Sequence, residues 1–104
     1  MPGIDYERLR REITMEEVLK LIGFAPVYRK GDQWYGRCPR HPWTAGRRHP
    51  FSVNVAIRAY CCHKCHRHGN QLDLWAAFTR RPLYPASIDL CRVLGREIPW
   101  LHRW

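Results

Sequence analysis

The chain has 104 residues, 45% of them hydrophobic, and a formal net charge of +9 at pH 7. This length and composition fit one small globular domain and exclude a disordered chain. The chain also lacks an apolar run long enough to span a bilayer, and its first residues lack the basic start and apolar stretch of a signal peptide. We therefore expect a single domain over residues 1–104, located in the cytoplasm and without a membrane partner.

The positive charge is concentrated in the middle of the chain. Residues 27–67 carry nine basic side chains against one acidic side chain, whereas residues 1–26 sum to −1 and residues 68–104 to +2. Fifteen of the 18 basic residues are arginine, whose guanidinium group can form bidentate hydrogen bonds with phosphate. A local basic segment of this kind favours a nucleic-acid partner, and a merely solvated surface is the alternative.

The first predicted element is helical. Apolar residues recur at near-helical spacing across residues 5–22, which form one or two helices. Thr14 and Glu17 match a capping box, so we expect a second helix to start at Met15. Gly23 is the expected terminator.

Two hairpins are predicted next. A Gly-Asp pair at 31–32 suits a tight turn, and two prolines with a glycine indicate a loop at 42–50. The four expected strands are 27–30, 33–37, 51–55 and 58–61.

The last third of the chain is predicted to be mainly helical. Asn70 caps a helix over 71–78, and a second helix over 86–94 ends at Gly95. We expect the inward side chains of that second helix to be Ile88, Leu90, Val93 and Leu94, with Cys91 also in the core. Residues 99–104 form a short aromatic tail. The central part of the domain spans about residues 27–80.

Two short Cys/His knuckles carry the strongest chemical signal. Cys38 and His41 enclose two residues, and so do Cys62 and Cys65. Thiolate and imidazole suit zinc better than calcium or magnesium, and four such ligands make a closed tetrahedral site of the structural kind. We expect one structural Zn²⁺ held by these four side chains. A catalytic zinc is disfavoured because it needs an open position and a nearby acid or base.

Other cysteines and histidines compete for these positions. Cys61 is next to Cys62, and only one of two neighbouring strand residues can face the ion. Cys62 is preferred because it leaves the two-residue gap, in which case Cys61 is a buried small side chain or an adventitious thiol. The rivals of His41 lack its spacing from Cys38, and we expect them at the surface or facing DNA. They are His49, His63, His66 and His68.

These residues resemble the CHC2 zinc-binding domain of DnaG-type bacterial and phage primases. Cys38-Pro39-x-His41 is similar to the first knuckle of that family, and Tyr60-x-Cys62-x-x-Cys65 to the second. The match covers about residues 10–80. It includes further stretches in the same order, namely Ile13–Leu21, Trp34-Tyr35-Gly36, Phe51-Ser52-Val53-Asn54, His68-Gly69-Asn70 and Leu72-Asp73-Leu74. The loop from His41 to Phe51 is longer than usual, Pro50 replaces a common serine, and His63 and Lys64 replace the usual aromatic-Gly pair.

The resemblance implies an α+β fold, with a small zinc-ribbon-like antiparallel sheet flanked by helices at 5–22 and 86–94. It also implies contact with single-stranded template DNA and help in starting a primer. No paired acidic motif of a polymerase core follows the finger, so we expect a stand-alone, non-catalytic finger.

Aromatic and basic side chains near the finger are the candidates for DNA contact. Trp34 and Tyr35 alternate along a strand, so at most one of them faces the DNA. The candidates are Arg29, Lys30, Trp34, Tyr35, Arg37, Arg40, Arg47, Arg48, Arg58 and Tyr60. The alternative function is an adaptor that docks on a separately encoded polymerase, helicase or transposition protein. The tail supplies Trp and Arg anchors for such an interface, or it folds back on the domain.

Overall fold

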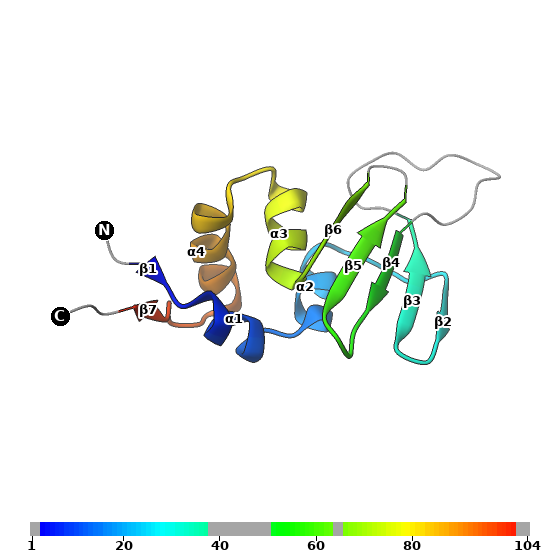
Figure 1. The fold of residues 1–104 in the computed structure, drawn as a ribbon, viewed down its shortest axis with the longest axis horizontal. Coiled ribbons are helices and arrows are strands. Elements are labelled where there is room, and N and C mark those ends of the chain that lie inside the picture. Colours follow the sequence, from blue (N-terminus) through cyan, green and yellow to red (C-terminus); the bar gives the residue numbers. More distant parts are fainter. Residues whose placement is uncertain (1–2, 38–50, 64–65, 102–104) are drawn as a thin grey trace.

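The computed structural model describes residues 3–37, 51–63 and 66–101 (Figure 1). In chain order its elements are β1 (Gly3–Ile4), α1 (Tyr6–Glu12), α2 (Met15–Leu21), β2 (Tyr28–Lys30), β3 (Gln33–Gly36), β4 (Phe51–Asn54), β5 (Ala59–Cys62), β6 (Arg67–Gly69), α3 (Gln71–Thr79), α4 (Leu83–Leu94) and β7 (Trp100–Leu101). Helices gather toward one end of the molecule and the larger sheet toward the other. The predicted α+β class with an antiparallel sheet flanked by helices is confirmed.

The first two helices start at side-chain caps. The Asp5 carboxylate accepts a hydrogen bond of 3.1 Å from the Arg8 main-chain N–H at the start of α1. At the start of α2, Thr14 Oγ1 accepts from the Glu17 N–H at 3.1 Å, and Glu17 Oε1 accepts from the Thr14 N–H at 3.0 Å. Both caps satisfy N–H groups that have no partner within their helix. The predicted capping box and the predicted start at Met15 are therefore confirmed.

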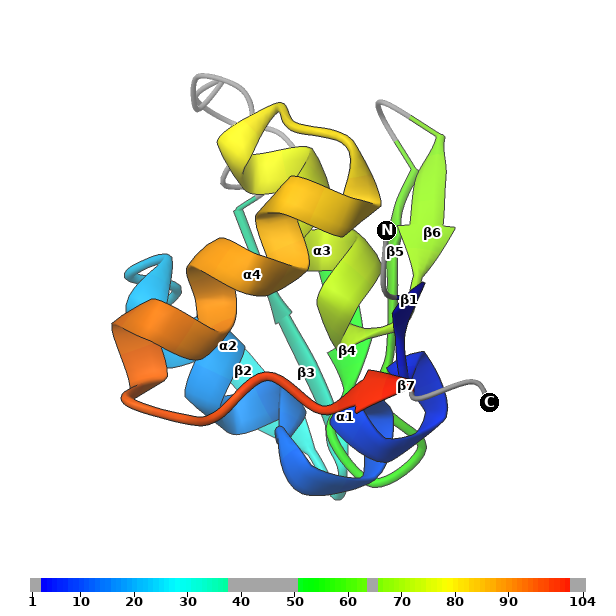
Figure 2. The same ribbon diagram turned by 90° about the vertical axis from the view of Figure 1, so that its left-hand side faces the viewer.

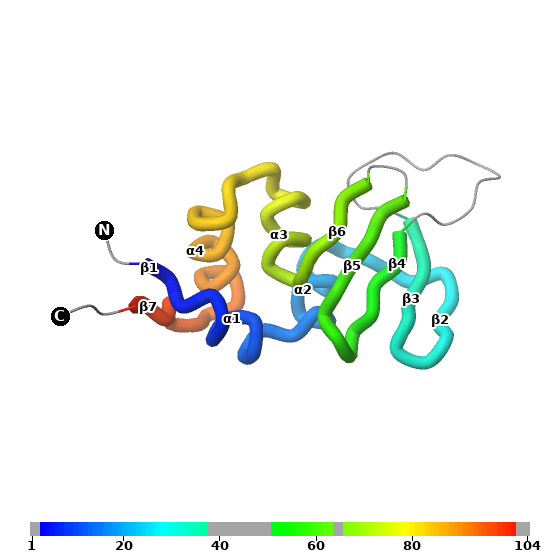
Figure 3. The backbone as a smooth tube through the Cα atoms, in the orientation of Figure 1, coloured from blue at the N-terminus to red at the C-terminus, as the bar shows by residue number. Residues whose placement is uncertain are grey.

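The larger sheet is an antiparallel meander in the order β2-β3-β4-β5-β6 (Figure 3). The turn between β2 and β3 is at Gly31 and Asp32, as predicted. The turn after β4 is held by Asn54, whose Oδ1 accepts from the main-chain N–H groups of Ala56 and Ile57 at 3.0 and 3.1 Å. The edge strand β6 was not predicted, because three residues directly after a knuckle carry no alternating apolar pattern.

The register gives this sheet a buried face and an open face. Paired residues of an antiparallel sheet point to the same side, and neighbours along a strand point to opposite sides. The row Trp34–Val53–Tyr60 and the row Gly36–Phe51–Cys62 face the helices, and all of these residues except the half-buried Trp34 are buried. The rows that alternate with them form the open face, and these are Tyr28–Tyr35–Ser52–Cys61–His68 and Lys30–Gln33–Asn54–Ala59.

Helix α3 is the central element of the helical layer (Figure 2). It contacts β5 and β6 of the sheet and also contacts α2 and α4. Leu72, Leu74 and Trp75 fill the space between these elements with 7% or less of their surface exposed. Asn70 caps α3 as predicted, because its Oδ1 accepts from the Leu72 and Asp73 N–H groups at 2.9 and 3.0 Å.

Helix α4 begins earlier than predicted, and three of its four predicted inward residues lie at the core. Leu90 is buried, and Ile88 and Leu94 are partly buried against the core. The helix starts at Leu83 rather than Ala86, because Pro85 lies in the first turn of the helix, where proline is tolerated. Its buried residues are Ala86, Ser87, Leu90 and Cys91. The prediction for Leu90 and Cys91 is confirmed, whereas Val93 is 50% exposed and was wrongly predicted to face the core.

The described part of the tail, residues 99–101, folds back on the domain, one of the two outcomes that the sequence left open. β7 pairs antiparallel with β1, and the Asp5 N–H donates to the Pro99 carbonyl oxygen at 2.7 Å. The two strands lie together at the helical end of the molecule (Figure 1). Trp100 packs against the core, with its ring centroid 6.3 Å from that of Tyr84.

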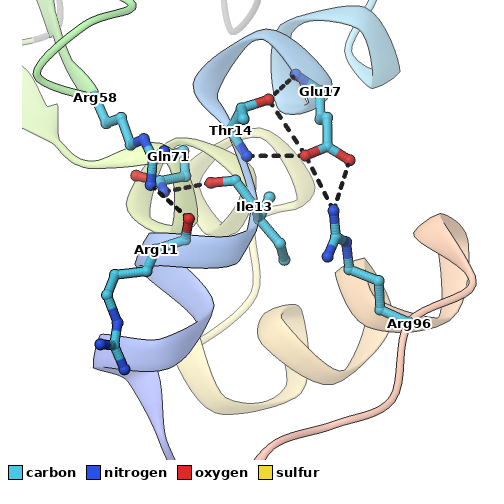
Figure 4. Close-up of polar contacts among 7 residues, drawn as sticks. All are labelled: Arg11, Ile13, Thr14, Glu17, Arg58, Gln71 and Arg96. Atoms are coloured by element: carbon cyan, nitrogen blue, oxygen red, sulfur yellow. Dashed lines mark hydrogen bonds and ion pairs between the residues drawn. The ribbon is translucent and has the colours of Figure 1, made fainter.

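A polar cluster ties the junction of α1 and α2 to three other parts of the fold (Figure 4). Arg58, in the turn before β5, donates through Nη1 to the carbonyl oxygens of Arg10 and Arg11. These carbonyls end α1 and have no partner within the helix, so the cation caps them and opposes the negative end of the helix dipole.

Among the described residues, no helix is long and apolar enough to cross a bilayer.

Candidate metal centre and nucleic-acid interface

One end of the sheet carries the residues from which both predicted knuckles depart. Gly36 at the end of β3 pairs with Phe51, and Phe51 pairs with Cys62 at the end of β5. Adjacent strands are about 4.8 Å apart, so β3 and β5 end roughly 10 Å from each other. Cys38 follows β3 by two residues, and Cys62 is itself the last residue of β5. The antiparallel register thus brings the end of β3, which precedes the first knuckle in the sequence, and the end of β5, which begins the second, to the same end of the sheet.

Gly36 permits close packing at this end. A Cβ on this residue would come within 2.8 Å of the Phe24 ring, which is closer than real side-chain contacts allow. Phe24 in turn packs edge-on against Phe51, with ring centroids 5.1 Å apart. A residue with a side chain would push the end of β3 away from this aromatic pair, and with it the start of the first knuckle.

The two neighbouring cysteines are separated by the pleat of β5. Cys62 is fully buried on the helix side, whereas Cys61 is partly exposed on the open face. The expectation that they point to opposite sides is confirmed, and the option of a buried Cys61 is corrected. Cys91 lies in the core, where burial raises the pKa of its thiol and so disfavours the reactive thiolate.

The other predicted ligands, Cys38, His41 and Cys65, lie outside the described residues, as does His49. The described rivals His63, His66 and His68 are exposed, as expected. Within 3–37, 51–63 and 66–101, no three His, Cys, Asp or Glu side chains are grouped so as to hold a metal.

The donor set of the predicted site fits zinc. Three thiolates and one imidazole are soft and borderline ligands of the kind that structural zinc sites use. Cys62 is buried at the end of β5, which agrees with a closed site, since structural zinc keeps no exchangeable water.

The open face of the sheet carries an aromatic pair. Tyr28 of β2 and Tyr35 of β3 are cross-strand partners, and their rings stack at a centroid distance of 4.6 Å with 14° between planes. Tyr28 is 52% exposed. The same row continues through the small side chains of Ser52 and Cys61 to His68 on β6. The row therefore presents flat aromatic surface at one edge and little bulk in its centre.

The strand pleat distributes the predicted DNA contacts between the two faces. Lys30 pairs with Gln33 in the second open row, so its ammonium group belongs to the same face as Tyr35. Arg29 and Trp34 belong to the helix side, where the Arg29 guanidinium carbon lies 4.1 Å from the Trp34 ring centroid. Of the alternating pair Trp34 and Tyr35, the open face thus receives Tyr35.

Two of the predicted contacts need correction. Tyr60 is only 6% exposed and packs beside Phe51 with ring centroids 5.9 Å apart, so its ring is not available for base stacking. Arg58 caps the carbonyls of Arg10 and Arg11, so its guanidinium serves the fold rather than a phosphate. Burial against helices and capping from a distant segment are tertiary effects that strand alternation does not reveal.

The remaining candidates are Arg37, which is exposed directly after β3, and three arginines outside the described residues, Arg40, Arg47 and Arg48. Sequence reasoning missed Tyr28 as a member of the open face. The available signal was the two-residue hairpin, because that loop length pairs residue 28 with residue 35.

Comparisons with known proteins agree with this architecture. The family model described as "CHC2 zinc finger" matches residues 3–103. A DNA primase of Treponema pallidum (strain Nichols) is 26% identical over 83 residues, which are 79% of this chain. The crystal structure of the Aquifex aeolicus primase, containing zinc-binding and RNA polymerase domains, superposes with a TM-score of 0.71 at 21% identity over 91% of this chain.

The matched regions are small parts of those proteins. The alignment covers 13% of the Treponema protein and 22% of the Aquifex chain. At 21% identity, the structural likeness shows a shared fold.

Proposed function

Because this chain belongs to the CHC2 zinc finger family, and because it is similar to parts of two primases, we propose that it is a DNA-binding module that prefers single-stranded DNA. In this proposal it assists primer initiation or a related DNA transaction, in company with a polymerase, helicase or transposition protein.

The observation that carries the proposal is the stacked pair of Tyr28 and Tyr35 on the open face of the sheet. Bases of a single strand are unpaired and stack on exposed rings, at about 1–3 kcal/mol for each base. In duplex DNA the faces of the bases are covered by their neighbours, so this surface favours a single strand. Lys30 on the same face and the exposed Arg37 supply cations for the phosphates that connect stacked bases.

One zinc ion, held by Cys38, His41, Cys62 and Cys65, completes the proposal. Such an ion cross-links the turn after β3 to the turn after β5 and thereby supports the sheet from one end. The residues of this chain provide the binding surface. We propose no catalytic role, because four protein ligands leave no coordination position for a reacting water.

Fluorescence anisotropy tests the proposal. Zinc-loaded protein is titrated into labelled single-stranded and duplex DNA of equal length at several salt concentrations, and again after zinc removal. We expect tighter binding to the single strand, a loss of affinity with rising salt from released counterions, and a loss of binding without zinc. Binding that is equal for both DNA forms, or flat with salt, would contradict the proposal.

The alternative is the protein-interaction adaptor. The sequence support for the adaptor was the aromatic tail. As far as Leu101 this tail is already bound within the domain, because β7 pairs with β1 and Trp100 packs against the core. DNA binding therefore ranks first. Deleting residues 99–104 separates the two functions: the adaptor predicts loss of partner capture with stability retained, and simple packing predicts a lower unfolding temperature.

A further inference from the structure

A concave surface lies between the edge strand β6 and helix α3, which contact each other. This edge groove measures about 670 Å³, within the range of roughly 300–1,000 Å³ that small-molecule sites occupy. Its lining includes Arg67 and His68 of β6, Asp73 and Ala76 of α3, and Arg80 and Arg81 just after α3. The groove is distinct from the stacked tyrosines, which lie at the opposite edge of the sheet on β2 and β3.

The charge of the edge groove is positive and local. Three arginines against one aspartate leave a formal charge of +2 on the lining. The Asp73 carboxylate is directed to the start of α3, where Oδ2 accepts from the Asn70 N–H at 3.0 Å and where the helix dipole favours negative charge. Asp89 approaches only Arg81 among the described cations, and at a long 3.9 Å. The lining therefore matches a dianion.

The backbone is strained at two residues that line the edge groove, one of them an arginine. His66 and Arg80 line the groove and have φ values of +56°, a region that residues with side chains rarely adopt. Helices α2 and α4 end with glycine at the corresponding left-handed position, Gly23 and Gly95. At the end of α3 the chain instead places an arginine there. Strain of this kind is often found at functional sites, although Arg58, which caps the end of α1, has the same conformation outside the groove. Arg80 lines the groove.

From this combination we infer that the edge groove binds a phosphate monoester, the dianionic group at the phosphorylated end of a nucleotide or of a nucleic-acid strand. Arginine forks match the oxygens of such a group, and the apolar side chains of Ala76, Ala77 and Pro82 border it. The inference goes beyond the proposed function, because it assigns a separate site at the other edge of the sheet that does not need the stacked tyrosines.

Two matched pairs of probes test the inference with the zinc-loaded chain of 104 residues. The first pair is AMP and adenosine, and the second is a hexathymidylate with a 5′-phosphate or a 5′-hydroxyl group. Each pair differs by one phosphoryl group, so the ratio of the two Kd values isolates its contribution. We expect the phosphorylated member of at least one pair to bind ten times more tightly or better.

The decisive variant combines Arg80→Gly with Arg81→Gln and leaves the residues next to the knuckle unchanged. Glycine relieves the left-handed strain, so we expect an unfolding temperature at least equal to that of the wild type. The phosphoryl preference should fall to less than threefold. Arg92→Gln, which removes an exposed cation of α4 outside the groove, should keep the preference, and so should Tyr35→Ala.

A preference within the first pair alone identifies a free nucleotide as the source, one within the second pair alone identifies a strand end, and one within both identifies the phosphoryl group itself. The inference is overturned if neither pair shows a preference, if the preference survives in the double variant, or if Arg92→Gln abolishes it equally. Failure of the tyrosine face would leave these ratios unchanged, so the two proposals are tested separately.

Discussion

Gln71 and Ile13, 58 positions apart in the chain, are joined by a hydrogen bond of 2.7 Å from the Gln71 side-chain amide to the Ile13 carbonyl oxygen (Figure 4). The same Nε2 donates to the Arg10 carbonyl oxygen at 2.8 Å. Gln71 is fully buried at the first position of α3. One side chain thus fixes the junction of α1 and α2 to the start of the central helix.

Replacing Gln71 should destabilise the fold. Gln71→Ala leaves the Ile13 carbonyl oxygen without its donor and removes one of the two donors to the Arg10 carbonyl oxygen, the other being Arg58. An unsatisfied buried group costs about 1–3 kcal/mol. We expect the free energy of unfolding to fall by about 2–3 kcal/mol in urea denaturation followed by circular dichroism. Gln33→Ala, on the open face of the sheet, is the matched control and should cost about 0.5 kcal/mol or less. Equal losses in the two variants would contradict the role of the Gln71 amide.

The neighbouring cysteines should differ in their hold on zinc. Cys62→Ser should release the metal and lower the unfolding temperature, because the buried thiolate is one of four expected ligands and metal binding is coupled to folding. Cys61→Ser should retain one zinc per chain, because its side chain points to the open face. Metal content measured after dialysis checks both variants. Zinc retained in Cys62→Ser but lost in Cys61→Ser would reverse the assignment.

The aromatic pair should govern affinity for single-stranded DNA. Tyr35→Ala removes a ring that stacks on Tyr28, and we expect binding to weaken about fivefold to 150-fold, equivalent to about 1–3 kcal/mol. Tyr35→Phe keeps the ring and should bind like the wild type. Anisotropy gives the affinities, and thermal unfolding shows that each variant is folded. If the alanine variant bound as tightly as the phenylalanine variant, stacking on this face would be excluded.

Glu17 should make stability depend on acid pH. The Thr14 main-chain N–H, and then the Arg96 guanidinium, donate to its carboxylate and lower its pKa from the ordinary 4.5. A carboxyl whose folded pKa is lowered contributes its full stability above the unfolded pKa and loses it as the pH falls through the folded pKa.

Glu17→Gln should therefore be less stable than the wild type at pH 7, by about 1 kcal/mol or less because both partners are about one-third exposed. The difference should shrink as the pH falls below about 4.5 and through the lowered folded pKa of Glu17. Denaturation midpoints measured across this range check the prediction. Glu16→Gln, an exposed neighbour in the same turn of α2, should show a smaller change. A difference that grew toward acid pH would contradict the sign.

Local signals in the sequence determined much of the fold. The capping box at Thr14, the cap at Asn70, the hairpin turn at Gly31 and the helix end at Gly95 each depend on residues within about four positions, so pattern and residue type suffice to predict them. The knuckle spacing predicts a zinc site, and the CHC2 family match agrees with it. That three of the predicted ligands lie outside the described residues leaves the ligand set a prediction.

Only the tertiary structure decided which side chains belong to the surface and which to the fold. Tyr60 is an exposed aromatic by strand pattern alone, but it becomes core because α3 covers that face of the sheet. By sequence Arg58 is an ordinary surface cation. In the fold its guanidinium donates to the carbonyl oxygen of Arg11 at the end of α1, 47 positions away in the chain. The pairing of β1 with β7 and the groove between β6 and α3 likewise join segments distant in sequence. Such contacts arise from the packing of whole elements, which short-range patterns do not encode.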